Sequence, residues 1–517
     1  MSLRDRFQTR LRDPRTREFL LWMLPALLLA LVLRIVLTVH LPYAYFHDDA
    51  PDFLTTPSHL LHEHKFELHA KKTFLVPLLF TLPFLLHVPA LLAIPVGQHL
   101  LGMGLVLIVG LLCRLWFRHW RVFILPLTLL IAANPFLLWY EHTLMAETVF
   151  VFTTMLVALA GTLYAGAQTR ARFVFLLIAL FLQAGARPEG KLLFGFGILL
   201  VALLHWRTWR TDWPRFATIV VLAVLTHLVT KTSQAGLLLY TSVARLTPTD
   251  LKCAPGFEPY IAPIRADLQA RWDIRPEFPR VRDRRAIAAA VESYLKAHPP
   301  NDGRKKRRGM DHFCLKIAKE TCWRNFTYLP IHVYHKFRVM ANEAPSGRFD
   351  NHWLFNMQRE ALISSSNRSL PIARALTGED LRDVPALHQF IDSHYGEVVW
   401  FNRWLDGRLT TVNRWRFPDL RVPNPKYPSV KVYHYGVPYY FLAAGIGVVA
   451  VALRRNELQR FHIAWSLTLL AFFYTIILTG NVRSRFRFVF EPFWFIYVAL
   501  LLECVWLTLA APFRRAK

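Results

Sequence analysis

Long uninterrupted blocks of apolar residues constrain this 517-residue chain more than any other feature. The blocks run for about 17 to 24 residues, close to the roughly 20 that an α-helix needs to cross the hydrocarbon core of a bilayer. Apolar side chains fill each block instead of marking one face of a helix. With 54% hydrophobic and 19% charged residues, the sequence predicts an α-helical polytopic membrane protein.

The chain is also strongly basic, with a formal net charge of +27 from 62 Lys and Arg against 35 Asp and Glu. In a soluble protein such an excess would suggest a nucleic-acid partner. Here the basic residues flank the apolar blocks, where they fix orientation and meet anionic headgroups, and no nucleic-acid-binding motif accompanies them. We therefore expect membrane lipids, and no nucleic acid, among the partners.

Basic residues predict which loops face the cytoplasm. Residues 1–18 carry six arginines, so the positive-inside rule places this tail in the cytoplasm and the first loop, 40–72, outside. Residues 73–95 contain four prolines, and we expect a re-entrant or interfacial helix pair there. About 10 transmembrane helices follow from the same reasoning, with both termini and the tail 512–517 cytoplasmic: 19–39, 97–113, 121–139, 144–166, 173–186, 190–206, 216–234, 434–453, 461–479 and 489–511.

A long polar insert, 235–433, separates the N-terminal transmembrane module 19–234 from the C-terminal three-helix segment 434–511. Parity of the spans places it outside the cytoplasm. Residues 284–295 have a helical pattern and 430–435 that of a strand or an interfacial belt, which predicts a mixed α/β domain. An oxidising compartment could pair two of its three cysteines, Cys253, Cys314 and Cys322, with Cys314–Cys322 the shorter closure.

Two adjacent carboxylates, Asp48 and Asp49, lie in the first outer loop. An anionic lipid surface disfavours further negative charge, which favours a role in substrate binding or chemistry. A carboxylate within hydrogen-bond reach of a hydroxyl can act as a general base, and its neighbour can orient it. The structural alternative is a helix start, because Asp followed by Ala-Pro is a good N-terminal signal.

Three closely spaced arginines, Arg483, Arg485 and Arg487, precede the last apolar block on the side where the positive-inside rule disfavours them. A lipid-linked phosphate would compensate for this unfavourable placement of positive charge, because guanidinium groups bind phosphate through charge-assisted, bidentate hydrogen bonds. A belt that anchors lipid headgroups is the simpler alternative. Lys71 and Lys72 end the first outer loop and are further candidates for binding phosphate.

Further ionisable residues are predicted to reach the same outer face, where such residues are costly and indicate a functional site. They are the substrate-binding candidates Glu141, His142, Glu147, Arg187 and Glu189. Glu147 begins an apolar helix and needs a partner, which could be sugar hydroxyls or Arg187.

Histidines and glutamates of the first outer loop could hold a divalent ion. Their spacing matches no zinc signature, so we expect no metal ion and no other cofactor. The residues concerned are His59, His62, Glu63, His64, Glu67 and His69.

Four motifs resemble those of the GT-C superfamily of membrane glycosyltransferases, in the branch of protein O-mannosyltransferases and aminoarabinose transferases that use polyprenyl-phosphate sugars. Their order and topology also resemble that branch, over the membrane part of the chain. The motifs are Asp48-Asp49-Ala50, Lys72-Thr-Phe-Leu-Val-Pro77, Leu144-Met-Ala-Glu-Thr-Val-Phe150 and Arg485-Phe-Arg-Phe-Val-Phe-Glu-Pro492.

The resemblance implies that Asp48 is the catalytic base, with Asp49 as the runner-up, and that Lys72 and Arg485 hold the donor phosphate. Thr73-Phe74 replace the prolines usual after the lysine, which leaves Lys71 or Lys72 open. The mid-chain insert stands where many relatives have a C-terminal domain, so acceptor recognition does not transfer.

We therefore expect an inverting glycosyltransferase that moves a sugar from a polyprenyl-phosphate donor to a hydroxyl of a glycan, lipid or protein. It would act in a bacterial inner membrane, on the periplasmic or exterior face. One alternative is a ligase or polymerase of lipid-linked polysaccharide, using arginine and histidine loops such as Tyr334-His-Lys-Phe-Arg338. Another is a lipid-linked sugar transporter or flippase. Two features count against it: the insert lies on one side only, and charged residues are scarce within the spans, Arg34 being an exception.

Overall fold

The computed structural model describes residues 13–40, 42–44, 50–65, 73–229, 235–274, 281–299, 306–330, 333, 389, 421–422, 433–434, 436–453, 458–479 and 490–515. These residues are mostly helical. Arg421–Val422 (β1) and Tyr433–His434 (β2) form a short antiparallel pairing, with Val422 opposite Tyr433. β2 lies within 430–435, where the sequence predicts a strand or an interfacial belt, and the mixed α/β character of the insert stays a prediction.

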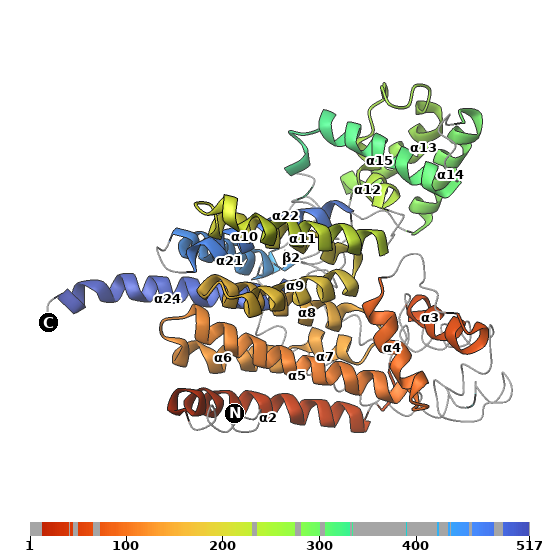
Figure 1. Ribbon diagram of the computed structural model, residues 1–517. Coiled ribbons are helices and arrows are strands. Elements are labelled where there is room, and N and C mark those ends of the chain that lie inside the picture. The colour runs from red at the N-terminus through yellow and green to blue at the C-terminus, as the bar shows by residue number, and fades with distance from the viewer. Residues whose placement is uncertain are drawn as a thin grey trace.

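Apolar helices lie side by side in a stack (Figure 1), and they occur where the sequence predicts spans. Adjacent members pack directly, as α8 does on α9 and α5 on α6. The stack contains α2 (Pro14–His40), α5 (Ala90–Trp116), α6 (Trp120–Ala132), α8 (Glu147–Gly166), α9 (Arg170–Ala186), α10 (Leu193–Leu204), α11 (Trp209–Val229), α21 (Gly436–Leu453), α22 (Gln459–Thr479) and α24 (Glu491–Arg515).

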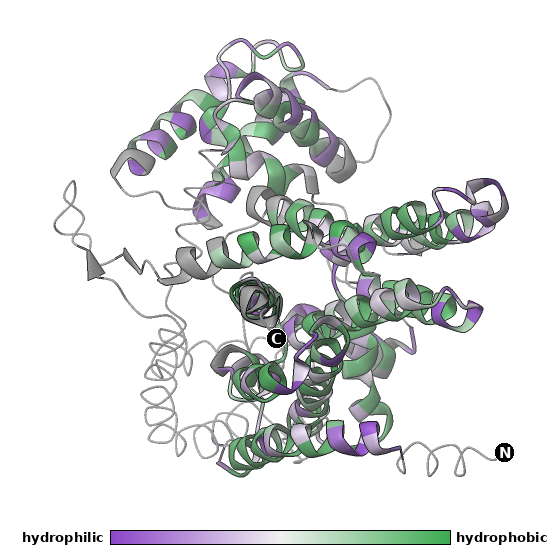
Figure 2. Ribbon diagram, turned by 90° about the vertical axis from the view of Figure 1, so that its left-hand side faces the viewer, coloured by the Kyte–Doolittle hydropathy of each residue, from purple (hydrophilic) through white to green (hydrophobic). Residues whose placement is uncertain are grey.

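Four of the described helices are long and apolar enough to cross a membrane: Pro14–His40, Ala90–Trp116, Glu147–Gly166 and the Glu491–Leu509 part of α24. Apolar side chains are also exposed on the outside of the stack, among them Leu21 at 60% and Val39 at 69% on α2. Figure 2 shows hydrophobic residues along the bundle helices and hydrophilic ones concentrated in the insert and at helix-connecting turns. An apolar exterior of this kind suits a lipid environment.

The predicted helix pair over 73–95 is only partly present. Its first member is the short helix α4 (Leu75–Leu85), which at about 1.5 Å per residue is too short to cross a bilayer. The chain then breaks before Pro89, and His87 adopts a left-handed φ of 55°. Its second member is the start of α5, which continues through Pro95 to Trp116. The prediction of a separate second helix was wrong, because a single proline can bend a helix without ending it.

The predicted span 121–139 is divided into two helices. α6 ends at Ala132, and α7 (Pro135–Glu141) follows after Ala133 and Asn134. The cause is Pro135, which disfavours helical geometry at the residue before it. The predicted span 190–206 likewise begins with a 3₁₀ turn, η1 (Pro188–Leu192), before α10. Both irregular segments lie beside the candidate site described below.

The described part of the insert is a helical unit with its own core. It contains α12 (Ala235–Val243), the 3₁₀ turn η2 (Ala244–Leu246), α13 (Glu258–Ile274), α14 (Val281–Ala297) and α15 (Lys306–Arg324). Buried Phe257, Tyr294 and Ile317 pack at its centre. α14 confirms the helix predicted at 284–295. The unit lies toward the end of the stack that also carries α3 (Ala50–Glu63) and α4 (Figure 1).

Cys253 and Cys314 of the insert are free thiols. Cys314 and Cys322 share helix α15, where eight residues correspond to a rise of about 12 Å. Bridged cysteines have Cα atoms within about 7 Å of each other, so the shorter of the closures that the sequence left open does not fit the structure. Burial raises the pKa of Cys314 to about 12, and burial together with a hydrogen bond to Glu320 does the same for Cys253. Neither thiol is activated for oxidation.

Candidate functional site

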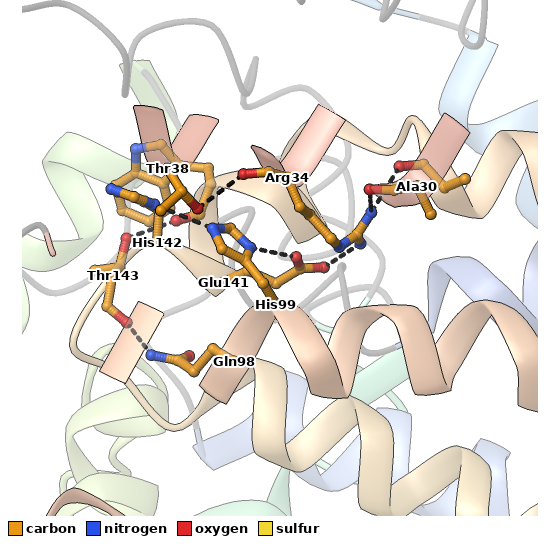
Figure 3. A network of polar contacts seen from close by, with 10 residues as sticks. Ala30, Arg34, Thr38, Gln98, His99, Glu141, His142 and Thr143 are labelled. Atoms are coloured by element: carbon orange, nitrogen blue, oxygen red, sulfur yellow. Dashed lines mark hydrogen bonds and ion pairs between the residues drawn. The ribbon is translucent and has the colours of Figure 1, made fainter. Parts of the chain in front are cut away.

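A network of buried polar side chains crosses from α2 to α7 inside the bundle (Figure 3). Arg34 of α2 donates from Nη2 to Oε1 of Glu141 at 2.6 Å, and from Nη1 to the Ala30 carbonyl at 3.0 Å. Oε2 of Glu141 lies 2.9 Å from Nδ1 of His99, on α5. Glu141 is 0% and Arg34 3% exposed. A buried ion pair is kept only with further hydrogen bonds of this kind, because both charges have lost their water.

The network continues from α5 to Tyr43, in the segment that follows α2. Nε2 of His99 lies 3.3 Å from Nδ1 of His142, and Nε2 of His142 donates to the carbonyl of Tyr43 at 3.1 Å. Both rings are buried. Tyr43 is five residues before Asp48 in the sequence. The network therefore connects the interior of the bundle to the segment that leads to Asp48 and Asp49.

Close packing of α5 makes room for this network. A Cβ added to Gly102 would lie 2.0 Å from Oε1 of Glu141 and 2.7 Å from Nη2 of Arg34. Real Cβ contacts are never so short, so any larger residue there would displace the ion pair. Gln98, one turn earlier on the same helix, donates to the carbonyl of Thr143 at 2.8 Å and so holds the α7–α8 junction.

A second ion pair lies where α8 begins. Arg187, at the end of α9, donates from Nη1 to Oε1 of Glu147 at 3.0 Å and from Nε to Oε2 of Glu189 at 3.3 Å. Its guanidinium also lies over the ring of Phe150, 5.4 Å from the centroid. Arg187 is one of the two partners that the sequence allowed for Glu147, the other being sugar hydroxyls.

Glu147 retains unused hydrogen-bonding capacity. Among the described residues, its Oε2 is buried and has no hydrogen-bond partner, and the same is true of Oγ1 of the adjacent Thr148. An unsatisfied buried carboxylate oxygen costs free energy comparable to a lost hydrogen bond, up to about 3 kcal/mol. A hydroxyl group brought by a ligand would satisfy it. Pairing with Arg187 and binding of a sugar hydroxyl are thus compatible, because they use different oxygens.

The last helix begins against the same part of the bundle. Glu491, the first residue of α24, is 0% exposed and accepts a hydrogen bond from Nδ2 of Asn134 at 3.1 Å. Asn134 lies in the break between α6 and α7, and its Oδ1 accepts from the backbone N–H of Leu137 at 3.4 Å. The segment 134–142 therefore contacts both the chain before Asp48 and the residue that follows the arginine run.

The structure brings together five predicted site residues in two groups, Glu141 with His142 and Glu147 with Arg187 and Glu189. α3 begins at Ala50, directly after Asp49, so the helix start favoured by Asp-Ala-Pro is present. The other predicted residues lie outside the described ranges: Asp48, Asp49, Lys71, Lys72, Arg483, Arg485 and Arg487.

Sequence reasoning missed several members of the site. These are Gln98, His99, Asn134 and Glu491, which are single polar residues within or next to apolar blocks. That position was itself a signal, because polar side chains at membrane depth face the protein interior and find partners there. Arg34 was noticed as a charge within a span, but its partner Glu141 is 107 residues away and no local pattern connects the two.

No group of three or more His, Cys, Asp or Glu side chains in the described ranges is arranged to hold a metal ion. The absence of a cofactor stays a prediction. Comparison of the sequence with models of known protein families finds no match, and a search of curated proteins finds no similar sequence.

Proposed function

We propose that this chain is an inverting membrane glycosyltransferase that transfers a sugar from a polyprenyl-phosphate donor to an acceptor hydroxyl on the outer face of the membrane. The proposal includes ten spans with both termini in the cytoplasm, and a base-and-phosphate site at the outer end of the bundle. Its acceptor is a hydroxyl of a glycan, lipid or protein.

The position of α7 carries the proposal. At one end, His142 binds the carbonyl of Tyr43, just before the acidic pair; at the other, Asn134 binds Glu491, just after the arginine run. Eight residue steps separate Asn134 from His142, a rise of about 12 Å in helical geometry. Tyr43 and Glu491 are therefore held near the two ends of one short helix, which supports a shared site for the segment that follows Tyr43 and the segment that precedes Glu491.

The chemistry assigned to these segments is a single displacement. Asp48, with Asp49 as the alternative, takes the proton of the acceptor hydroxyl as its oxygen bonds to the anomeric carbon. The bond from that carbon to the phosphate oxygen breaks, and the electron pair leaves with the lipid phosphate. Lys72 or Lys71 with Arg485, and the neighbouring Arg483 and Arg487, stabilise the negative charge that develops there.

The second ion pair supports a role in binding the sugar. Arg187 neutralises one oxygen of Glu147 and leaves the other buried and unused among the described residues. Glycosyl hydroxyls are donors that such an oxygen accepts well, and an acceptor buried away from water discriminates strongly against ligands that lack a matching hydroxyl. Glu189 and Arg187 frame this position at the start of η1.

Single variants Asp48→Asn and Asp49→Asn test the base. Proteoliposomes containing the full chain would be supplied with a panel of undecaprenyl-phosphate-linked sugars, and release of undecaprenyl phosphate would be measured. We expect one variant to lose about 10²- to 10⁴-fold in rate, the usual contribution of a general base. Asp267→Asn is the matched control, because Asp267 is 59% exposed on α13 of the insert.

Full activity in both aspartate variants would contradict the base assignment. The phosphate assignment has a separate test, binding of undecaprenyl phosphate to the purified protein by native mass spectrometry. We expect Arg485→Gln to weaken that binding while phosphatidylglycerol binding stays unchanged. Equal loss of both lipids would instead indicate a belt that anchors headgroups.

A further inference from the structure

The turn between α10 and α11 presents aromatic and basic side chains outward, on a part of the chain that the proposed reaction does not use. Trp206, Trp209 and Trp213 are 78%, 49% and 55% exposed. Arg207 and Arg210 stand between them in the sequence and are also exposed. A single exposed indole needs no explanation, but three within eight residues form a patch that marks an interaction surface.

The turn lies at the end of the stack opposite α3 and α4 (Figure 1). α10 starts beside η1, and its 12 residues carry the chain about 18 Å away from Arg187. The hydroxyl of Tyr164, near the end of α8, lies 2.8 Å from Nε2 of His205, so the turn is level with the end of α8. The positive-inside rule places this end in the cytoplasm, where the facing leaflet carries anionic lipid.

The indoles continue the apolar exposed side of α11. Exposed Val220, Val224 and Leu228 follow Trp209 and Trp213 at the three- and four-residue spacing of one helix face. Nineteen residue steps separate Trp209 from Leu228, a rise of about 28 Å that matches the roughly 30 Å hydrocarbon core of a bilayer. The indoles therefore stand at the boundary between hydrocarbon and headgroups, where tryptophan is enriched.

Arg207 and Arg210 retain their hydrogen-bonding capacity. Neither has a hydrogen bond or an ion pair to any described residue. The nearby carboxylate of Asp212 is already engaged within the protein by other side chains. The end of α10 is also satisfied, because Nη1 of Arg460 donates to the carbonyl of Leu204 at 3.2 Å. Two guanidinium groups are thus left for a partner outside the described protein.

The backbone of this turn is fixed by its own hydrogen bonds. Nδ1 of the buried His205 and Oγ1 of Thr208 both donate to Oδ2 of Asp212, at 2.8 and 2.6 Å. The backbone N–H groups of Thr211 and Asp212 both donate to the carbonyl of Thr208 at 3.0 Å. These contacts hold the start of α11 in place before a ligand binds, which lowers the entropy cost of binding at Arg210.

We propose that the α10–α11 turn binds the headgroup of an anionic phospholipid. Arg207 and Arg210 donate charge-assisted hydrogen bonds to its phosphate, for which the planar guanidinium is well suited. The three indoles lie at the level of its glycerol and first acyl carbons. A zwitterionic lipid would meet the indoles equally well, but it compensates the two cations less. The site does not depend on the proposed transferase activity.

Other arginines at this end of the stack are arranged differently. Arg121 binds Glu18. Arg118 and Arg170 are exposed, but the described α5–α6 and α8–α9 turns that carry them have no exposed tryptophan. They supply the same charge at the same end without the indoles, and therefore provide a matched control.

Photo-crosslinking tests the site in the full chain. The protein would be reconstituted in phosphatidylethanolamine vesicles that contain a trace of photoreactive phosphatidylglycerol or of photoreactive phosphatidylcholine. Crosslinks to the fragment 205–216 would be measured by mass spectrometry. In the wild type we expect phosphatidylglycerol to label this fragment roughly thirtyfold more than phosphatidylcholine, because each basic residue near an anionic lipid contributes about fivefold.

Two double variants separate the charges from the indoles. Arg207→Gln with Arg210→Gln should bring the ratio of the two lipids close to one. Trp206→Ala with Trp213→Ala should lower labelling by both lipids, since an indole does not select charge. If a double variant fails to fold, single Arg207→Gln and Arg210→Gln carry the test, and each should lower the ratio about fivefold.

Arg118→Gln with Arg170→Gln is the control, and it should leave labelling of the fragment 205–216 as in the wild type. Three results would overturn the site. Equal labelling by both lipids in the wild type would indicate a general interface, and an equal loss in the control would indicate a diffuse charge effect. Displacement of phosphatidylglycerol by inorganic phosphate at constant ionic strength would indicate a site for free phosphate.

Discussion

Two histidine clusters lie near opposite ends of α8, and they differ in what terminates them. The first is the chain of contacts from Glu141 through His99 and His142 to the carbonyl of Tyr43, near the start of α8. The second joins Tyr164, His205, Asp212 and Arg215, about 26 Å farther along α8 in helical geometry. Both hold a buried imidazole in hydrogen bonds at both nitrogens. Only the first has acceptors at both of its ends.

In the second cluster the donors and acceptors balance. Nδ1 of His205 donates to Oδ2 of Asp212 at 2.8 Å, and Nε2 accepts from the hydroxyl of Tyr164 at 2.8 Å and from Nη1 of Arg215 at 3.1 Å. A neutral imidazole satisfies all three contacts. Asp212 and Arg215 form an ion pair of their own, 3.1 Å apart, so the cluster has no net charge.

The comparison teaches that the end groups, and not the burial of a histidine, decide what its cluster holds in place. The second cluster draws its members from α8, α10 and α11, near the loop that the sequence places in the cytoplasm, and it fastens those helices together. The first cluster draws on α2, α5 and the end of α7, and it ends on the backbone of the segment that follows α2. One cluster fastens helices to each other, and the other fastens a connecting segment to the bundle.

The largest expected difference between the two clusters is in the cost of removing the arginine. Arg34→Met leaves the buried Glu141 without its cation, and we expect a loss of about 3–5 kcal/mol in the free energy of unfolding. Arg215→Met should cost only about 1 kcal/mol, because Asp212 keeps its hydrogen bonds from His205 and Thr208. Thermal unfolding of the full chain in detergent measures both. Equal costs would break the comparison.

Packing around the Arg34–Glu141 ion pair gives the next largest effect, and α5 supplies its own control. We expect Gly102→Ala to destabilise the protein by about 1–3 kcal/mol, because the added methyl group would overlap Glu141 and Arg34. Gly97→Ala on the same helix has nothing within 4 Å of the new Cβ. It should be neutral, or stabilising by roughly 0.5–1 kcal/mol through the loss of backbone entropy in the unfolded chain. A stable Gly102→Ala protein would show that the ion pair is not close-packed.

Replacing the histidine of the second cluster should have a smaller effect. His205→Gln can still donate to Asp212 or accept from Tyr164, so we expect a loss of about 1 kcal/mol in the free energy of unfolding. Chemical denaturation of the full chain checks this. A loss as large as that of Arg34→Met would mean that the amide does not replace the imidazole in these hydrogen bonds.

The smallest effect is expected for an ion pair with neither burial nor a network. Arg121 binds Glu18 at 2.5 Å, with side chains 62% and 35% exposed. We expect Glu18→Gln to change the free energy of unfolding by at most about 1 kcal/mol, and less at high salt. The same thermal measurement at two salt concentrations provides the baseline for the buried pairs. A cost approaching that of Arg34→Met would mean that exposure does not distinguish these pairs.

Much of the fold could be predicted because the bilayer imposes it locally. A block of about 20 apolar residues can only become a helix that satisfies its own backbone, so helices occur where the blocks occur. The errors are at prolines. Pro95 lies inside α5, whereas Pro135 divides a predicted span in two. A proline excludes one hydrogen bond, and its neighbours decide whether the helix continues.

The candidate site was predictable only in part. Glu141, His142, Glu147, Arg187 and Glu189 could be chosen from the sequence, because charged residues at the ends of apolar blocks are costly unless they serve a purpose. Their grouping could not. The choice of Arg187 for Glu147, and of Arg34 and His99 for Glu141, depends on which helices are neighbours, and helix order in a bundle leaves no periodic trace in the sequence.

The sequence alone determined that this protein is built from apolar helices, which residues are too polar to be there without reason, and where a loop rich in carboxylates begins. Those properties depend on the free energy of transfer between water and lipid, which each segment carries by itself. Only the tertiary structure decided that Glu141, His99 and His142 form one chain of contacts that ends on Tyr43. These hydrogen bonds join residues that are far apart in the sequence, so they form only where helix packing brings those residues together.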